Sequence, residues 1–423
     1  MRTRLLIPVL CLFPIFAANA QSLQRGDPRP LGFAPERLAR LTRTLDKYAA
    51  DRRLAGGVAL IARRGQIAYL HPFGMRDVEA KAPMQADAIF RIASQTKALV
   101  SVGVMMLMED GALLLSDPVG KYIPQFMKTK VAVAKEGGGY DVVDARRPIT
   151  IRDLLTHTAG IHYGLSGIAR EEWVRAGMVG WYFADRNEPM DSIVVRIASL
   201  PLETQPGERF VYGYATDILG VVIERITGKS LEQFLRERIL VPLRMNDTHF
   251  FLPAEKRNRL TVVYSSRDDG TIARAPAGAG MASQGDYVDG PRKAFGGGAG
   301  LLSTASDYAR FLQMLLNGGE LDDVRLLSPA SVKLMTSDHV ANYLGADRGF
   351  GLGFETIEDL GAYGQLGSEG TFGWGGAYHS SYWVDPAEDL VVVYLTQLAP
   401  ARGIDDFGKL RALIYSSLVA PKR

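Results

Sequence analysis

The chain has 423 residues, of which 47% are apolar and 22% charged, and its formal net charge is +3. This is the composition of a globular protein with a sizeable apolar core. The nearly neutral charge balance gives no electrostatic basis for binding nucleic acid, so we expect no nucleic-acid partner.

The first twenty residues have the three parts of a secretory signal. Arg2 and Arg4 make a basic start, residues 5–16 form an apolar run that is short for a membrane span, and residues 18–20 (ANA) form a small-x-small cleavage site. We predict that residues 1–20 are a signal peptide cleaved near Ala20, and that the protein is exported to the periplasm or secreted. An uncleaved N-terminal anchor is the alternative. No later run approaches 18 apolar residues, so no stable membrane insertion is expected after processing.

The cysteine and histidine content argues against a metal site. The single cysteine, Cys11, lies in the leader, so the mature chain has no disulfide, no thiol nucleophile and no cysteine ligand. The six histidines form no tight ligand spacing such as His-Glu-x-x-His. We therefore predict neither a metal nor a cofactor.

The N-terminal third predicts a helix, a pair of strands and a second, apolar helix. Pro35 opens an amphipathic helix at a first-turn position. The apolar runs 57–62 and 66–70 flank a turn at residues 63–65, which is typical of two neighbouring strands. A long apolar helix is expected from Ser94 to about Glu109.

The middle of the chain is helix-rich, and strands return near the C-terminus. This order indicates an α/β fold whose sheet is assembled from both ends of the chain, with helices inserted between them. The expected helices are 151–156, 216–226, 231–239 and about 405–418, the expected loop is 265–298, and the expected strands are 352–357, 381–384 and 390–395.

Ser94-Gln-Thr-Lys97 is the first candidate for chemistry. Residues i and i+3 of a helix lie side by side, so the Ser94 hydroxyl and the Lys97 amine are expected to be neighbours at a helix start. A serine hydroxyl becomes a good nucleophile only when a nearby base takes its proton, and the helix N-terminus favours an oxyanion. The alternative is a capping serine followed by a solvated lysine. The run after Lys97 is apolar almost all round, which indicates a buried helix and a lysine with a specific role.

Five motifs, in this order, resemble the class C β-lactamase and penicillin-binding superfamily, and above all its esterase branch, the family VIII carboxylesterases. The likeness covers essentially all of residues 35–420. It implies a β-lactamase-like α/β fold, with an antiparallel sheet domain (residues 34–92 and 295–420), a mainly helical domain (residues 93–294) and an active site at their interface. The motifs are 91–97 (RIASQTK), 154–161 (LLTHTAGI), 206–214 (PGERFVYGY), 300–311 (GLLSTASDYARF) and 374–376 (WGG).

The resemblance implies a role for each residue that matches a motif. Ser94 would be the acylated nucleophile and Lys97 its base or proton relay. Tyr212 matches the tyrosine that shares the general-base role and protonates the leaving group, and the choice between Lys97 and Tyr212 as base stays open. Tyr214 stands where the lactamases keep an asparagine, so the resemblance implies that Tyr214 contacts the substrate. The loss of the amide puts recognition of a β-lactam side chain in doubt.

The motif Trp374-Gly375-Gly376 matches the Lys-Thr-Gly strand of the lactamases, where lysine and threonine hold the substrate carboxylate. Trp374 and Gly375 offer no cation and no hydroxyl there, which favours an uncharged ester at this position. The resemblance implies that the backbone N–H groups of Ser94 and Ala377 form the oxyanion hole. His379 is expected to line the pocket, with a packing role as its alternative.

Together these features predict a serine hydrolase that acts through an acyl-enzyme on Ser94. The favoured function is a carboxylesterase for short-chain or aromatic esters, with a small-molecule ester as partner. The alternatives are a β-lactamase or D-amino-acid peptidase, an acyltransferase, and a non-catalytic cell-wall binder on the same scaffold.

Overall fold

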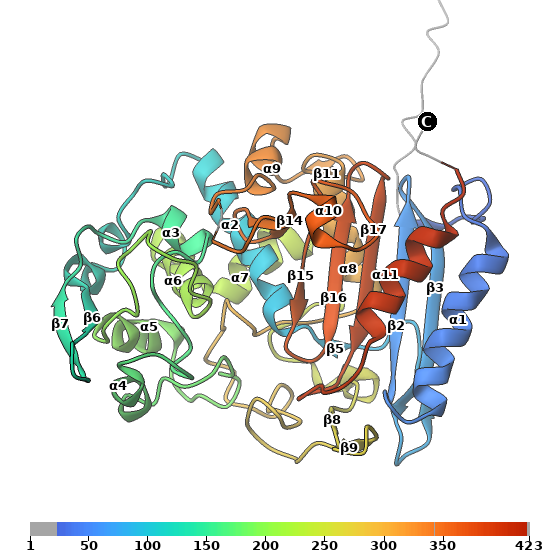
Figure 1. Cartoon of the computed structure of the whole chain (residues 1–423), viewed down its shortest axis with the longest axis horizontal. Coiled ribbons are helices and arrows are strands. Elements are labelled where there is room, and N and C mark those ends of the chain that lie inside the picture. Colours follow the sequence, from blue (N-terminus) through green and yellow to red (C-terminus); the bar gives the residue numbers. More distant parts are fainter. Residues whose placement is uncertain (1–22, 342, 421–423) are drawn as a thin grey trace, which may run out of the picture.

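The computed structural model describes residues 23–341 and 343–420 (Figure 1), so the predicted signal peptide lies outside the described residues. A nine-stranded sheet forms the centre of the fold, in the order β1-β3-β2-β17-β16-β15-β14-β13, with β4 paired to β3. All neighbours are antiparallel except β1 and β3. The strands are β1 (Gln24–Arg25), β2 (Gly56–Arg63), β3 (Gln66–Asp77), β4 (Ala82–Pro83), β13 (Arg348–Phe350), β14 (Glu355–Ile357), β15 (Phe372–Gly376), β16 (Ser380–Asp385) and β17 (Leu390–Thr396).

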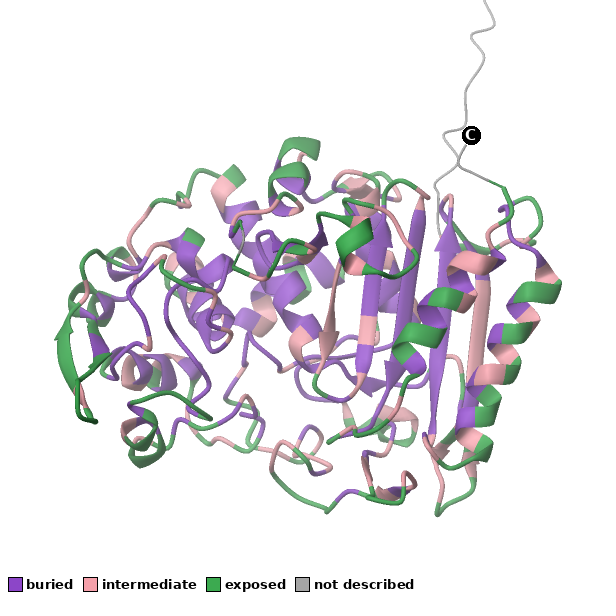
Figure 2. Ribbon diagram, viewed as in Figure 1, coloured by how far each residue is buried: buried purple, intermediate pink, exposed green. Residues whose placement is uncertain are grey.

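The N- and C-terminal parts of the chain meet where β2 pairs with β17, from Gly57 opposite Thr396 to Arg63 opposite Leu390. Every residue of these two strands is buried, because helices cover both faces of the sheet (Figure 2). This arrangement confirms the predicted α/β fold with a sheet built from both termini.

The side chains of β2 alternate between two apolar cores. Ala59 and Ile61 pack in the cluster that holds α1 (Pro35–Ala50) and α11 (Asp406–Ser417), the two helices in front of the sheet in Figure 1. Val58 and Leu60 face the opposite way, into the cluster that contains α2 (Thr96–Glu109) and α8 (Ala305–Leu316). The second cluster continues from the sheet into the helical part of the chain, so one core joins the two parts. The domain boundaries at residues 93 and 295 stay a prediction.

The segment between β5 and β10 is mainly helical, with two hairpins, β6–β7 and β8–β9, that the sequence did not predict. The predicted helix at Ser94 begins as the 3-10 turn η1 (Ala93–Gln95) and continues as α2, and the helix expected over 231–239 ends at Leu235 and runs into the π turn η4 (Arg236–Leu240). The remaining elements of the segment are β5 (Phe90–Arg91), η2 (Val119–Lys121), η3 (Pro124–Lys128), β6 (Lys130–Ala134), β7 (Tyr140–Asp144), α3 (Ile151–Leu155), α4 (Arg170–Arg175), α5 (Met190–Ala198), α6 (Ala215–Thr227), α7 (Leu231–Leu235), η5 (Ala254–Arg259), β8 (Tyr264–Ser266), β9 (Ile272–Arg274) and β10 (Leu302–Ser303).

After β10, the hairpin β11 (Glu320–Leu321) and β12 (Val324–Arg325) and the helices α9 (Pro329–Met335) and α10 (Leu360–Tyr363) connect α8 to the sheet. The strand expected over 352–357 forms only as β14, and β13 precedes it. Within the described part of the chain, no helix combines the length and apolarity that crossing a membrane requires.

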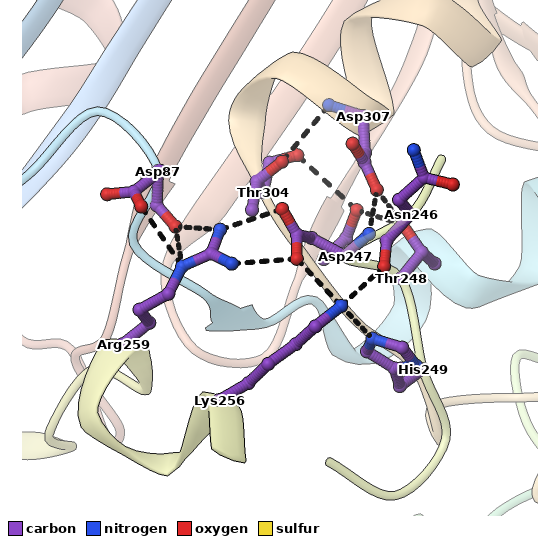
Figure 3. Close-up of polar contacts among 10 residues, drawn as sticks. Asp87, Asn246, Asp247, Thr248, His249, Lys256, Arg259, Thr304 and Asp307 are labelled. Atoms are coloured by element: carbon purple, nitrogen blue, oxygen red, sulfur yellow. Dashed lines mark hydrogen bonds and ion pairs between the residues drawn. The ribbon is translucent and has the colours of Figure 1, made fainter. Parts of the chain in front are cut away.

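A network of ion pairs fixes the loop that follows η4 (Figure 3). Asp247 accepts two hydrogen bonds from the Arg259 guanidinium, at 2.8 and 2.7 Å, and pairs with Lys256 at 2.9 Å. Arg259 also pairs with Asp87, and the backbone N–H of Asp247 donates to Asp307 in the first turn of α8. The network therefore joins a residue that precedes β5, the loop and turn that follow η4, and the first turn of α8.

Candidate active site

Ser94 and Lys97 lie side by side at the start of α2. The Lys97 Nζ is 3.3 Å from the Ser94 Oγ, as the i, i+3 spacing predicts. Ser94 is half-buried, whereas the Lys97 side chain is only 2% exposed. A lysine buried to this extent must find its hydrogen-bond partners within the protein.

Two further oxygens complete the surroundings of Lys97. Its Nζ is 2.9 Å from the Tyr163 hydroxyl and donates to the Gly298 carbonyl at 2.8 Å. The carbonyl can only accept, and the hydroxyl can accept or donate, so one direction at Nζ remains for Ser94. In an ammonium this direction is an N–H; in an amine it is a lone pair that can take the serine proton. The same geometry thus serves both protonation states.

The turn that carries Ser94 is held by contacts from two elements, β16 and α8. Ala93 adopts a positive φ of 43°, a conformation that a non-glycine residue keeps only when its surroundings enforce it. The Gln95 side chain donates to Ser380 on β16 at 3.0 Å, and the Gln95 carbonyl accepts from the Tyr308 hydroxyl on α8 at 2.9 Å. These contacts fix the nucleophile relative to the sheet.

Tyr212 lies over the Lys97 ammonium, just before α6. The Lys97 Nζ is 4.6 Å from the centroid of the Tyr212 ring, and the Tyr212 hydroxyl accepts a hydrogen bond of 2.9 Å from the Trp374 indole N–H. Ser94 and Tyr212 line the same cavity. The structure thus brings the predicted hydroxyl, amine and phenol together, with the phenol oriented by Trp374.

Tyr163 is a member of the site that the sequence did not identify. Its ring meets the Tyr212 ring edge-on at 5.8 Å, and its hydroxyl bonds to Lys97. Burial, followed by the nearby Tyr212 and Asp217, raises the pKa of Tyr163 well above its usual value, so this phenol stays neutral. The only sequence feature that could have identified Tyr163 is its position two residues after the 154–161 motif.

A buried carboxyl group lies behind Lys97. Asp217 on α6 accepts from the Gly298 N–H at 2.8 Å, and the Gly298 carbonyl in turn binds Lys97. The second carboxyl oxygen of Asp217 is buried without a hydrogen-bond partner. Burial raises the pKa of Asp217 to about 6, although the Lys97 charge opposes this shift. Asp217 and Lys97 are therefore linked through the backbone of one residue, Gly298, rather than by a direct hydrogen bond.

His157 supports the other side of Tyr212. Its ring lies 4.6 Å from the Tyr212 ring and is 1% exposed. Burial, and to a smaller extent the Lys97 charge, lowers the pKa of His157 well below 6.5, so the imidazole is neutral. The neutral ring thus packs against the side of the Tyr212 ring.

The glycines of β15 allow this strand to approach the nucleophile turn. A Cβ on Gly376 would lie 2.5 Å from the carbonyl oxygen of Ile92, so no side chain fits there. Ala377 follows directly and lines the cavity together with Ser94. Ser94 is the second residue of a helical turn, where N–H groups lack helical acceptors. This arrangement suits the oxyanion hole that the resemblance implies for these two N–H groups.

His379 lines the cavity and is also held in place. Its Nε2 lies 2.7 Å from the Asp406 carboxylate, and its ring stacks on Phe407 at 4.1 Å. Asp406 is 1% exposed and also accepts from the Tyr394 hydroxyl at 2.8 Å. His379 therefore combines the two predicted roles: it packs against α11 and it lines the cavity.

The position of Tyr214 corrects the expectation that it contacts substrate. Its side chain is 0% exposed and does not line the cavity. The hydroxyl donates to the Gly180 carbonyl at 2.6 Å, and the ring stacks on Trp173. The residue two after Tyr212 points into the helical core because α6 begins there and turns its first side chains inward.

The cavity in front of Ser94 has a volume of about 860 Å³. This is at the large end of the range of about 300–1,000 Å³ that holds drug-sized ligands. Trp181, Trp374 and Tyr212 contribute aromatic walls near Ser94. In the described ranges, no three His, Cys, Asp or Glu side chains gather in a way that could hold a metal ion.

Comparison with known proteins places this site in a family context. The family described as Beta-lactamase matches residues 41–413. Protein Rv1367c of Mycobacterium tuberculosis is 36% identical over 83% of this chain and 88% of its own length. Esterase EstB of Burkholderia gladioli is 34% identical over 85% of this chain and 90% of its own.

Similarity extends to an acyltransferase and to a solved structure. Monacolin J acid methylbutanoyltransferase of Aspergillus terreus is 28% identical over 85% of this chain and 91% of its own length. The structure titled EstCE1, a hydrolase with promiscuous acyltransferase activity, superposes with a TM-score of 0.76 at 28% identity and covers 91% of this chain and 99% of that one.

Proposed function

Since the chain belongs to the Beta-lactamase family and is a serine hydrolase, we propose that it is a carboxylesterase that forms an acyl-enzyme on Ser94. The observation that carries this proposal is the hydrogen bond from Trp374 to Tyr212. The indole occupies the position where the resemblance places a carboxylate-binding lysine, and it is engaged with the catalytic phenol. The region next to the scissile bond is therefore suited to an uncharged ester. The similarity to esterase EstB supports the same function.

The geometry suggests how acylation proceeds. The Lys97 lone pair takes the Ser94 proton as Oγ attacks the ester carbonyl, and the N–H groups of Ser94 and Ala377 stabilise the oxyanion. The C–O bond then breaks, and Tyr212 gives a proton to the departing alcohol, which leaves the acyl group on Ser94. The proton held by Lys97 restores the phenol. Water attacks the acyl-enzyme by the reverse use of the same groups and releases the acid.

Acyl transfer is the second candidate function. The cavity of about 860 Å³ offers room for an acceptor alcohol as well as for an acyl group. An acyltransferase and a hydrolase with promiscuous acyltransferase activity are among the similar proteins. An alcohol in place of water would attack the same acyl-enzyme, so this function needs no further catalytic group.

The proposal is tested by comparing two substrates with purified protein. We expect turnover of 4-nitrophenyl butyrate and little or no turnover of nitrocefin, and loss of the esterase activity in Ser94→Ala with an unchanged circular dichroism spectrum. Turnover of nitrocefin alone would reject the esterase in favour of a lactamase. Ester cleavage that survives in Ser94→Ala would reject the acyl-serine.

A second measurement separates hydrolysis from acyl transfer. Adding a primary alcohol such as butanol to the ester reaction diverts the acyl group from water to the alcohol if transfer is efficient. Chromatography would then show butyl butyrate in place of butyrate. An unchanged yield of butyrate would restrict the function to hydrolysis.

A further inference from the structure

One wall of the active-site cavity carries a buried arginine that the proposed chemistry does not use. Arg411 lies on α11, lines the same cavity as Ser94 and is 7% exposed. Its Nε donates to the Leu366 carbonyl at 2.6 Å, while its Nη2 is buried without a hydrogen-bond partner. A guanidinium stays charged at any physiological pH and has five N–H donors, so most of its donors are free.

Aromatic rings, rather than carboxylates, surround this guanidinium. Its Cζ lies 5.1 Å from the ring centroids of Tyr363 and Trp383, and 5.3 Å from that of Tyr415. Aromatic rings stabilise a nearby cation, but they offer no oxygen acceptor to its N–H groups. The site thus favours a positive charge and leaves the in-plane donors for another group.

Two carboxylates in this region already have other partners. Glu355 pairs with Arg348 at 2.9 Å, and Asp385 accepts from the Tyr415 hydroxyl at 2.8 Å and from two backbone N–H groups. Within the described residues, Arg411 takes part in no ion pair shorter than 4.0 Å, whereas Arg348, which also lines the cavity, has two. Arg348 is therefore engaged by two carboxylates, whereas Arg411 has no carboxylate in direct contact among the described residues.

The register of β15 and β16 shows how far apart along the strands the positions next to Ser94 and next to Arg411 lie. Gly376 lies against Ile92 beside Ser94, whereas Trp383, which contacts Arg411, pairs with Gly373. Three residues of strand correspond to about 10 Å. A ligand that extends along these strands would reach both Ser94 and Arg411.

We propose that Arg411 forms an anion subsite, and that the preferred substrate is an ester that carries a carboxylate about 10 Å from the scissile bond. This proposal deepens the proposed function and rests on it. Carboxylate is the complementary group because it accepts hydrogen bonds in the guanidinium plane. The absence of a cation at Trp374 and the presence of one at Arg411 together select a remote carboxylate over one next to the reacting carbonyl.

The test uses matched esters that differ in one charge. The 4-nitrophenyl half-ester of suberic acid is compared with 4-nitrophenyl octanoate for the acyl side, and 4-acetoxyphenylacetate with 4-acetoxyphenylacetamide for the alcohol side. In at least one pair we expect the wild type to favour the carboxylate at least about tenfold in kcat/KM, as for one charged hydrogen-bonded contact. Arg411→Gln should remove this preference and leave the neutral ester within about twofold, and Arg411→Lys should keep part of it.

Two results would overturn the subsite. They are the absence of any preference in the wild type for both pairs, and an equal loss on both members of a pair in Arg411→Gln. If Arg411→Gln does not fold, the subsite is tested by inhibition of the wild-type enzyme. Suberate should then inhibit cleavage of 4-nitrophenyl butyrate more strongly than the diamide of suberic acid does. Equal inhibition would reject the subsite.

A failure of the proposed function gives a different pattern. If no ester is turned over, the esterase is rejected, and calorimetry with suberate and its diamide still tests the subsite by itself. Stronger binding of suberate that is lost in Arg411→Gln would support the anion subsite. Binding of neither compound, or of both equally, would reject it.

Discussion

Two polar clusters of this molecule hold a lysine side chain in opposite ways. In the network of Figure 3, Lys256 pairs with Asp247 at 2.9 Å, and Asp247 also holds Arg259. In the active site, Lys97 contacts the oxygens of Ser94, Tyr163 and Gly298 and no carboxylate within 4.0 Å among the described residues.

This difference indicates that Lys256 stabilises the fold, whereas Lys97 is placed to transfer a proton. A lysine bonded to a carboxylate is held as an ammonium, because losing its proton would leave the partner anion unpaired. A lysine among neutral oxygens can gain or lose a proton while its hydrogen bonds persist. We therefore expect substitutions in the first cluster to change stability, and substitutions in the second to change rate.

The largest expected effect follows from replacing Lys97. Lys97→Met removes the proton acceptor for Ser94 and should lower kcat/KM for a 4-nitrophenyl ester by about 10²- to 10⁴-fold, the range for acid–base groups. The matched control, Lys256→Met, should keep activity within about twofold. Both are measured by steady-state kinetics. Comparable losses in the two variants would abolish the distinction between the clusters.

Tyr212→Phe should lower kcat by about a hundredfold, because the leaving alcohol loses its proton donor. Tyr214→Phe is the matched control, since the two tyrosines are two residues apart but the Tyr214 hydroxyl donates to the Gly180 carbonyl, away from the cavity. The control should lose about 1–2 kcal/mol of unfolding free energy and little activity. Urea denaturation and kinetics measure the two effects. Near-normal turnover by Tyr212→Phe would show that another group protonates the alcohol.

Two aspartates should shift stability with pH in opposite directions. Burial raises the pKa of Asp217 to about 6, so its ionisation disfavours folding, and the stability present below about pH 4 is lost as the pH rises through 6. Asp217→Asn should therefore gain on the order of 2–3 kcal/mol at pH 8 relative to wild type and nothing below pH 4.

Asp247 has the reverse sign. Burial would raise its pKa, but hydrogen bonds and charge from Arg259 and Lys256 outweigh burial and lower it below 3.8. Its contribution is present above pH 4 and is lost as the pH falls through the lowered pKa. Asp247→Asn should cost about 1–3 kcal/mol at pH 7 and less in acid. Denaturation series across pH measure both variants, and parallel pH profiles would contradict the assignment.

The smallest effect is expected at Trp374. Trp374→Phe keeps an aromatic wall but removes the N–H that holds the Tyr212 hydroxyl, and we expect about a tenfold loss in kcat with a small change in KM. Kinetics on one neutral ester measure it. A loss confined to KM would assign Trp374 to substrate binding alone.

The sequence predicted those features that depend on local periodicity. The apolar runs 57–62 and 390–395 appear as β2 and β17, and the spacing of Ser94 and Lys97 predicted their contact. The β6–β7 hairpin was not predicted because most of its residues are exposed and follow no buried pattern.

Features that depend on distant contacts could not be read from local sequence. Tyr163 and Gly298 reach Lys97 from segments 66 and 201 residues away. Tyr214 was misplaced for the same reason, since its burial depends on Trp173 and Gly180, and no local pattern shows that α6 starts there with its first side chains inward.

The most direct test of the central claim is the site of acylation. Tyr212→Phe is mixed with 4-nitrophenyl octanoate, quenched in acid at intervals, and analysed by intact mass and peptide mapping. We predict one octanoyl group per chain on the peptide that contains Ser94, and none when Ser94→Ala or Lys97→Met is added. An adduct on any other residue, or ester cleavage with no adduct at any time, would contradict the account.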